Sequence, residues 1–153
     1  MREGAKKRTP ATPSARILLV DDEEAILQTM RSILETEGYA VETASGGREA
    51  LELFRQTSCD VALCDVKMQG MDGIELLVAL REIAPELPVI MLSGHGTIDT
   101  AVESLKKGAY DYIQKPLDLN RLLVSLRNAL ERTSLVEETQ RLRQRVQQDS
   151  ELI

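Results

Sequence analysis

The sequence predicts an α/β fold in which helices cover both faces of a doubly wound, five-stranded parallel sheet. Short apolar runs, typical of strands buried on both faces, alternate five times with segments whose apolar residues recur at helical spacing. This alternation favours parallel strands, because a crossover helix returns the chain to the same edge of the sheet before each new strand. A length of 153 residues suits one such domain with an appendage.

Gly and Pro residues separate the predicted elements. Gly38 and Gly108 are expected to stop helices, and Pro85 to follow the end of another. The predicted strands span residues 16–20, 39–43, 59–65, 89–92 and 110–113. The predicted helices span residues 25–34, the stretch after Gly47, 74–83, 97–107 and the chain from 119 onward. The apolar anchors of the helix at 97–107 are few and small: Ile98, Ala101, Val102 and Leu105.

The composition excludes several classes of protein. Aromatic residues make up 3% of the chain and the net charge is −6, which disfavours base-stacking platforms and a general nucleic-acid surface. Cys59 and Cys64 lack a zinc spacing and would face opposite sides of one strand, so both are expected to be buried, unpaired thiols in a reducing compartment. Without an apolar run of membrane-spanning length or a signal-peptide pattern, a cytoplasmic location is expected.

Residues 1–15 form a separate segment in this prediction. They are basic, contain two prolines and lack periodicity, which is typical of a flexible tail. A basic arm that touches DNA is the alternative interpretation.

Polar side chains follow four of the five predicted strands at the point where each strand ends. Asp21 and Asp22 follow the first strand, and Asp65 ends the third. Ser93 follows the fourth strand and Lys115 the fifth. Because the carboxyl ends of parallel strands meet at one edge, we expect these groups to share a single crevice.

The chemistry of such a crevice favours phosphoryl transfer. Three neighbouring carboxylates repel one another unless a cation lies among them, and oxygen ligands suit Mg²⁺. A carboxylate such as Asp65 can attack phosphorus to give an acyl phosphate, whose charge Mg²⁺ and Lys115 would neutralise. The hydroxyl of Ser93 and the loop amides at Lys67 and Gly94 could donate to the phosphoryl oxygens. Each motif alone would suit a helix cap or a turn, and only their combination favours a site.

At these residues the sequence resembles the receiver domain of bacterial two-component response regulators. The resemblance covers about residues 15–132 and rests on the motifs Leu-Val-Asp-Asp-Glu, Cys-Asp-Val-Lys-Met-x-Gly-Met-Asp-Gly, Leu-Ser-Gly-His-Gly and Lys-Gly-Ala-Tyr-Asp-Tyr-Ile-x-Lys-Pro. It implies a (βα)5 flavodoxin-like fold with strand order 2-1-3-4-5, a receiver at 16–132 and a helical linker at 133–153. It also implies a signalling phosphoacceptor that is not an enzyme and catalyses only its own phosphorylation and dephosphorylation.

The resemblance implies a role for each matching residue. Asp65 matches the phosphorylated residue, with Asp22, Asp65, the Lys67 carbonyl and, through water, Asp21 as Mg²⁺ ligands. The other implied roles are the phosphate-binding lysine at Lys115, the switch residues at Ser93 and Tyr112, a cis bond before Pro116 and tuning of dephosphorylation by Lys67 and His95. Without the resemblance, His95 is an ordinary loop residue, and Tyr110 and Tyr112 are ordinary packing on one strand face.

The residues after 132 continue the last helix with heptad-like spacing. The stripe is formed by Leu135, Thr139, Leu142, Val146 and Ile153. Leu135, Leu142 and Val146 are therefore candidate dimer contacts in a coiled coil, whereas a solvated single helix is the alternative. This extension resembles the nitrogen-regulation type of sigma-54 enhancer-binding activators, which implies that the chain is a fragment of a longer regulator.

The function predicted from the sequence is a phosphorylation switch. A sensor histidine kinase would phosphorylate Asp65 in the presence of Mg²⁺, and the change in conformation and dimerisation would control an output domain that activates transcription. A standalone phosphorelay or adaptor receiver is one alternative. A phosphohydrolase of the haloacid-dehalogenase type is another, although Lys67 stands where that class needs a second Asp. Direct binding of this chain to nucleic acid or membrane is not expected.

Overall fold

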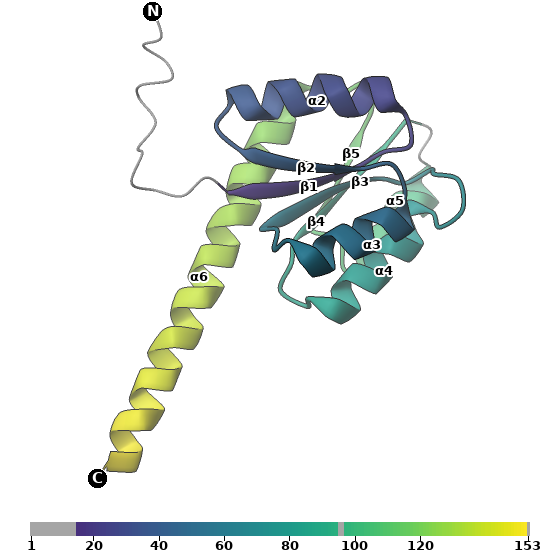
Figure 1. The fold of residues 1–153 in the computed structure, drawn as a ribbon. Coiled ribbons are helices and arrows are strands. Elements are labelled where there is room, and N and C mark those ends of the chain that lie inside the picture. The colour runs from purple at the N-terminus through teal and green to yellow at the C-terminus, as the bar shows by residue number, and fades with distance from the viewer. Residues whose placement is uncertain (1–14, 95–96, 153) are drawn as a thin grey trace, which may run out of the picture.

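A five-stranded parallel sheet forms the centre of the molecule (Figure 1). The computed structural model describes residues 15–94 and 97–152. The sheet has the order β2-β1-β3-β4-β5, so the predicted fold class and strand order are confirmed. The strands are β1 (Arg16–Val20), β2 (Ala40–Ala44), β3 (Val61–Asp65), β4 (Val89–Ser93) and β5 (Asp111–Gln114).

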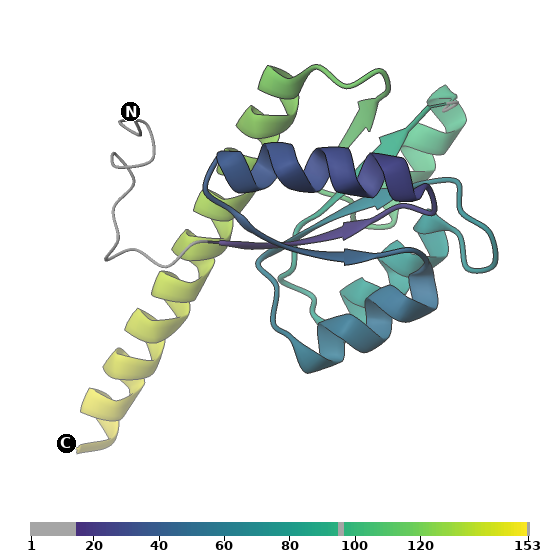
Figure 2. The ribbon, with the colours of Figure 1, turned by 45° about the horizontal axis from the view of Figure 1, so that its top comes forward.

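Helices pack on both faces of the sheet because successive strand residues point to opposite sides (Figures 1 and 2). The helices are α2 (Glu24–Thr36), α3 (Gly47–Gln56), α4 (Gly73–Ile83), α5 (Ile98–Lys106) and α6 (Leu119–Leu152). On one face, β1 residues Ile17 and Leu19 share a core with α2 and α6. On the other, Leu18 and Val20 share a core with α3 and α4. Each fully buried Leu or Ile in these cores stabilises the fold by roughly 1.5–3 kcal/mol.

Local sequence signals fix where the helices begin and end. Asp72 accepts a hydrogen bond from the Glu75 amide while the Glu75 carboxylate accepts one from the Asp72 amide, which starts α4 with a capping box. Gly38 and Gly108, the glycines predicted to end α2 and α5, both have a positive φ of +104°. At Gly108 a side chain would also meet Arg81, because a Cβ there would lie 2.7 Å from the Arg81 Nε.

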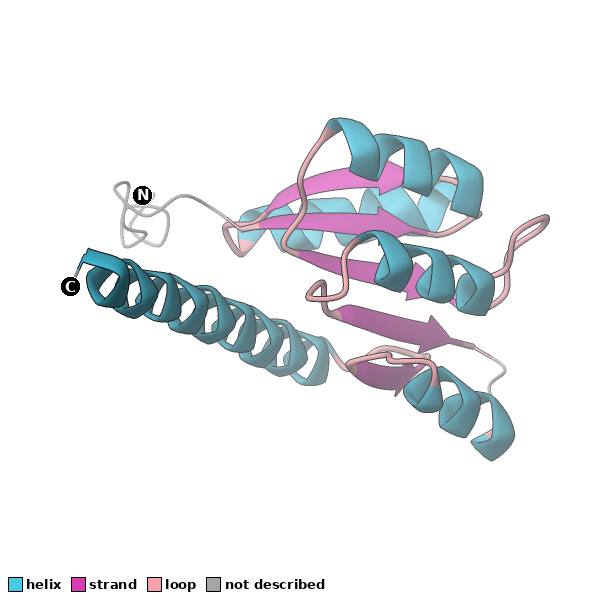
Figure 3. Cartoon of the chain, turned by 90° about the horizontal axis from the view of Figure 1, so that it is seen from below, coloured by secondary structure: helices cyan, strands magenta, loops and turns pink. Residues whose placement is uncertain are grey.

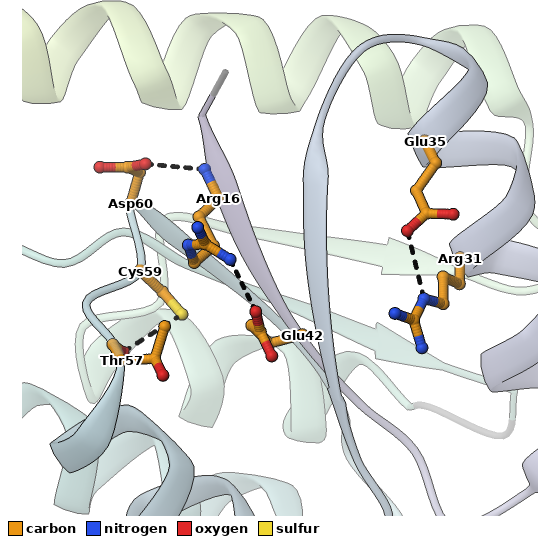
Figure 4. Close-up of polar contacts among 7 residues, drawn as sticks. All are labelled: Arg16, Arg31, Glu35, Glu42, Thr57, Cys59 and Asp60. Atoms are coloured by element: carbon orange, nitrogen blue, oxygen red, sulfur yellow. Dashed lines mark hydrogen bonds and ion pairs between the residues drawn. The ribbon is translucent and has the colours of Figure 1, made fainter. Parts of the chain in front are cut away.

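Six strand boundaries differ from the prediction by one or two residues. β2 and β5 each begin and end one residue later than predicted, β4 ends one residue later, and β3 begins at Val61 rather than at residue 59. The Asp60 carboxylate accepts a hydrogen bond from the Arg16 amide at 2.7 Å (Figure 4). The Asp60 amide also donates to the Arg16 carbonyl at 2.8 Å, so Asp60 pairs with Arg16 just before β3 begins. Cys59 therefore precedes the strand and is half-buried, which corrects its prediction as a buried thiol, whereas Cys64 is buried as expected. Both thiols are free.

The spacing of Tyr110 and Tyr112 predicted that they share one face of the strand. In the structure they lie on opposite faces. Tyr110 packs against the core formed with α2 and α6, and Tyr112 against the core formed with α3 and α4. The reason is that Tyr110 precedes β5, so the strand alternation does not extend to it.

The α5 helix packs on the domain differently from the prediction. Three of its predicted anchors face solvent, with Ile98 exposed to 82%, Val102 to 42% and Leu105 to 50%. The residue that α5 buries fully is the polar Ser104, whose hydroxyl has no hydrogen-bond partner among the described residues. α5 lies beside β5 (Figure 3). It is weakly anchored, since its apolar stripe is turned away from the core.

The α6 helix is continuous from the domain into the predicted linker. Its first part buries Leu122, Leu126 and Ala129 against the sheet, and the rest extends away from the domain (Figure 1). Leu135, Leu142 and Val146 are exposed to 54–65%. Within the described residues, none of the helices has the length and apolar character that crossing a membrane requires. Nearly all of the predicted basic tail at 1–15 lies outside the described residues.

Candidate functional site at the carboxyl edge of the sheet

Backbone hydrogen bonds also join the segments that lie just beyond the carboxyl ends of the strands. The Asp21 amide donates to the Ala44 carbonyl, and the Val66 amide donates to the Leu92 carbonyl. The Lys115 amide donates to the Ser93 carbonyl at 2.8 Å. These bonds hold the segments that follow β1, β3 and β5 at one edge, so the predicted polar residues converge there.

Three carboxylates meet at this edge. Asp21 and Asp65 are buried, with 2% and 7% of their surfaces exposed, and Asp22 is exposed to solvent. One oxygen of each carboxylate lies within 4.8 Å of an oxygen of the other two. Because like charges at this separation repel, the arrangement favours a bound cation or a proton.

Lys115 extends from the end of β5 to the buried carboxylates. Its Nζ lies 3.3 Å from the Asp21 Oδ2 and 3.8 Å from the Asp65 Oδ1. The second oxygen of Asp21 accepts a hydrogen bond from the Glu23 amide at 2.9 Å. Lys115 therefore supplies a fixed positive charge to the site, and of the two buried carboxylates Asp21 lies closer to its ammonium group.

The pKa of Asp65 is raised above its ordinary value. Burial is the largest cause, and the negative charges of Asp21 and Asp22 act in the same direction. Lys115 and a hydrogen bond from the Lys67 amide lower the pKa, but they do not compensate fully. Without a further cation, the site therefore favours the protonated form of Asp65 more than water does.

A pocket of about 500 Å³ opens beside Asp65. It is lined by Asp22, Glu23, Ile26, Asp65, Lys67, Gly94, Lys115 and Pro116. Lys67 lines this pocket and is exposed to solvent, and its role in tuning dephosphorylation stays a prediction. Ser93 is 3% exposed at the end of β4, one residue beyond Leu92, which pairs with Asp65 in the sheet register.

The remaining predicted residues lie at different distances from this pocket. The Lys115–Pro116 peptide bond is cis, as the resemblance implied. Tyr112 is half-buried on β5, and its hydroxyl is buried without a hydrogen-bond partner among the described residues. His95 lies outside the described residues. Leu135, Leu142 and Val146 belong to the distal part of α6 and contribute nothing to the pocket.

Gly73 contributes to the site in a way that the sequence reasoning missed. It is the first residue of α4, and its amide donates to the Val66 carbonyl at 2.8 Å. A Cβ at this position would overlap the Asp65 carbonyl oxygen and lie 2.7 Å from the Val66 Cα. The backbone that carries Asp65 therefore packs directly on the start of α4, a contact whose only signal in the sequence is the glycine itself.

The donor set fits a hard divalent cation. The carboxylates of Asp21, Asp22 and Asp65 supply oxygen ligands, and exposed Asp22 lines the open pocket where water can complete a coordination sphere.

Comparison with known proteins decides the family. The family model described as the response regulator receiver domain matches residues 17–127. The chain belongs to the response regulator receiver family. Among the solved structures similar to this receiver is NtrX from Brucella abortus, with 40% identity, a TM-score of 0.80 and coverage of 88% of this chain and 30% of that one.

Two further relatives are instructive. The transcriptional regulatory protein ZraR from Klebsiella oxytoca is 42% identical over 121 residues, which are 79% of this chain and 27% of ZraR. The beryllofluoride-activated NtrC4 receiver domain dimer is 40% identical with a TM-score of 0.73, covering 77% of this chain and 98% of that one. This receiver spans less than a third of the length of the curated relatives first matched.

Proposed function

We propose that this receiver accepts a phosphoryl group on Asp65 and passes the resulting change in conformation to an output domain. The observation that carries the proposal is the position of Asp65: its buried carboxylate opens on a pocket, with Lys115 Nζ 3.8 Å away and two further carboxylates beside it. A nucleophile, a fixed cation and a ligand set for a divalent metal are thereby brought together.

Each residue has a role in the proposed transfer. A carboxylate oxygen of Asp65 attacks the phosphorus of a phosphohistidine in a sensor kinase. The P–O bond forms as the P–N bond breaks, and the histidine nitrogen leaves with the electron pair. Lys115 neutralises charge on the phosphoryl oxygens, and the Lys67 amide, which already donates to the Asp65 carboxylate, supports the same end of the site.

Mg²⁺ would be held by Asp22, Asp65 and the Lys67 carbonyl, with Asp21 acting through water, and it would supply further neutralisation of the phosphoryl charge. Asp21 keeps its own ion pair with Lys115, which suits the indirect role. Lys67 and His95 would tune dephosphorylation, since Lys67 lines the pocket opening.

The switch would run from Ser93 through Tyr112 to α5. The Ser93 hydroxyl would move toward the phosphoryl group and free space on β5 for Tyr112, whose buried hydroxyl lacks a partner in the described part of the chain. α5 is suited to move because it buries only Ser104 fully and exposes its apolar stripe. A pairing of two receivers through α5, β5 and the exposed α6 stripe would follow, and the beryllofluoride-activated NtrC4 receiver domain is itself a dimer.

The biological setting of the proposal comes from the relatives. ZraR is named a transcriptional regulatory protein, and this receiver matches only part of it. We infer a cytoplasmic receiver that controls transcription through an output domain of the sigma-54 enhancer-binding type and has no activity on other substrates.

Phosphorylation by acetyl phosphate tests the proposal. Wild-type protein should gain one phosphoryl group in the presence of Mg²⁺ and lose the reaction when the metal is chelated. Asp65→Asn should abolish the gain, while Asp60→Asn, a matched change at the opposite end of β3, should leave it intact. Equal labelling of Asp65→Asn and wild type would overturn the proposal.

A further inference from the structure

Asp111, the first residue of β5, accepts hydrogen bonds from four donors. Its carboxylate accepts both guanidinium nitrogens of Arg121 on α6, at 2.7 and 3.0 Å, in a bidentate pair. It also accepts the Ser125 hydroxyl at 2.7 Å and the Tyr112 amide at 2.8 Å. One side chain thus connects the strand that carries Tyr112 with the helix that leaves the domain.

The partners on α6 lie on one face of the helix. Arg121 and Ser125 are separated by one turn, and Arg132 follows two turns after Ser125 with its guanidinium 5.7 Å from the ring centre of Tyr110. Two consecutive residues, Tyr110 and Asp111, therefore contact three positions along the same stripe of α6. These contacts define both the rotation of α6 about its axis and its position along the strand.

The buried part of this arrangement lies at Asp111 and Ser125, whereas the Arg121 side chain is 46% exposed. Ser125 is 3% exposed, so its hydroxyl depends on Asp111 for a hydrogen bond. Burial acts to raise the pKa of Asp111, but hydrogen bonds from Arg121, Ser125 and Tyr112 outweigh it and hold the pKa below its ordinary value. The carboxylate remains charged throughout the physiological range.

The apolar contacts of α6 do not fix its direction to the same degree. Leu122, Leu126 and Ala129 bury the helix on the sheet, but hydrophobic contact is not directional and tolerates small rotations. Beyond Thr133, the side chains of α6 that the structure describes are exposed as far as residue 146, so this part of the helix is not packed on the domain. The direction of the long α6 helix is therefore set by the contacts of its first four turns.

We propose that Asp111, Arg121 and Ser125 form a latch that fixes α6 on β5 and carries movement of the Tyr112 strand to the distal part of α6. These are positioning residues, and the proposal rests on the switch proposed above. A displacement of β5 shifts the Asp111 carboxylate, and the bidentate pair obliges Arg121 and the helix to follow. If the contacts of the latch are broken, Asp65 would still be phosphorylated, but the movement of β5 would not be passed on to α6.

Distance measurements between spin labels on α2 and distal α6 test the latch. Labels at Thr29→Cys and Gln144→Cys in a Cys59→Ser background, diluted with unlabelled protein, report the direction of α6 within one chain. Cys64 stays unlabelled because it is buried and its pKa is raised to about 12. The variants are Asp111→Asn and Arg121→Gln, singly and together, with Ser125→Ala as a milder change.

The matched control is Glu42→Gln, which breaks an ion pair of Glu42 with Arg16 between neighbouring strands without touching α6 (Figure 4). Each variant is compared with and without acetyl phosphate and Mg²⁺. Acyl phosphate formation on Asp65 is measured in parallel, so that a loss of phosphorylation is distinguished from a loss of transmission.

Wild type and Glu42→Gln should show a narrow distance distribution that shifts on phosphorylation. Asp111→Asn should be phosphorylated at the wild-type rate, with a broader distribution that no longer shifts, and the double variant should lose nothing more. A phosphorylation-dependent shift that survives in Asp111→Asn would overturn the latch, as would a wild-type distribution that phosphorylation leaves unchanged. If no protein is phosphorylated, the proposed function fails, and an unbroadened distribution in unphosphorylated Asp111→Asn would separately overturn the latch.

Discussion

Substitution of Gly73 by Ala tests the packing that positions Asp65. A Cβ at Gly73 would overlap the Asp65 carbonyl oxygen and lie 2.7 Å from the Val66 Cα, well inside the ordinary contact distance that begins near 3.4 Å. Relief requires the start of α4 to move away from the loop, which weakens the 2.8 Å bond from the Gly73 amide to the Val66 carbonyl.

The expected cost can be worked from these contacts. Overpacking of a rigid backbone contact costs about 1–3 kcal/mol, and loss of a backbone hydrogen bond adds about 1 kcal/mol. The higher helix propensity of Ala returns up to about 1 kcal/mol, which leaves a net loss of about 1–3 kcal/mol. For a domain of this size the melting temperature should fall by roughly 3–12 °C.

Thermal melts and acetyl phosphate labelling provide the assay. Gly46→Ala is the matched control, because no atom lies within 4 Å of its Cβ position and its backbone is extended, with φ of −170°. We expect Gly73→Ala to melt lower and to be phosphorylated more slowly, since the Asp65 backbone is displaced. A melting temperature and labelling rate equal to those of Gly46→Ala would refute the reasoning.

Three further predictions concern the metal, the pH dependence and the helix. Asp22→Ala should raise the melting temperature of the metal-free protein by relieving repulsion, and should lose most of the stabilisation that Mg²⁺ gives wild type; equal Mg²⁺ responses would count against the site. Because the pKa of Asp65 is raised in the folded protein, the metal-free stability should fall as pH rises from the ordinary Asp pKa through the folded one, and urea unfolding of Asp65→Asn should show a flatter profile. Leu142→Asp should weaken a concentration-dependent dimer in sedimentation, whereas Gln144→Asp on the opposite side of α6 should not; a chain that is monomeric at high concentration in both phosphorylation states would contradict the pairing.

The sequence was sufficient for the parts of the fold that depend on periodicity. The alternation of strands and helices predicted the parallel sheet, and in such a sheet the strand ends must meet at one edge. Asp21, Asp65 and Lys115 therefore could be placed together before any coordinate was known. The resemblance then supplied the strand order and the cis bond before Pro116, which periodicity does not contain.

The errors lie where tertiary contacts override local pattern. Ile98, Val102 and Leu105 recur at helical spacing, but spacing does not say which side of a helix meets the sheet, and α5 buries Ser104 instead. Tyr110 lies one residue before its strand, so its face could not be read from alternation.

The contacts of Arg121 and Gly73 were missed for a related reason. Arg121 looks like a solvated helix residue in the sequence, and only the fold brings the Asp111 carboxylate to it. Gly73 looks like a loop glycine, and its contact with the Asp65 backbone depends on how α4 packs. In both cases the two contacting residues are too far apart in the sequence to be neighbours within one helix or one strand, so no local pattern connects them.

The most direct test of the central claim is to identify the phosphorylated residue chemically. After reaction with acetyl phosphate and Mg²⁺, borohydride reduces an aspartyl phosphate to homoserine, and mass spectrometry of the peptides locates that residue. We predict conversion at Asp65 alone, with Asp21 and Asp22 recovered unchanged. Homoserine at Asp21 or Asp22, or phosphate on a residue away from this edge of the sheet, would contradict the account.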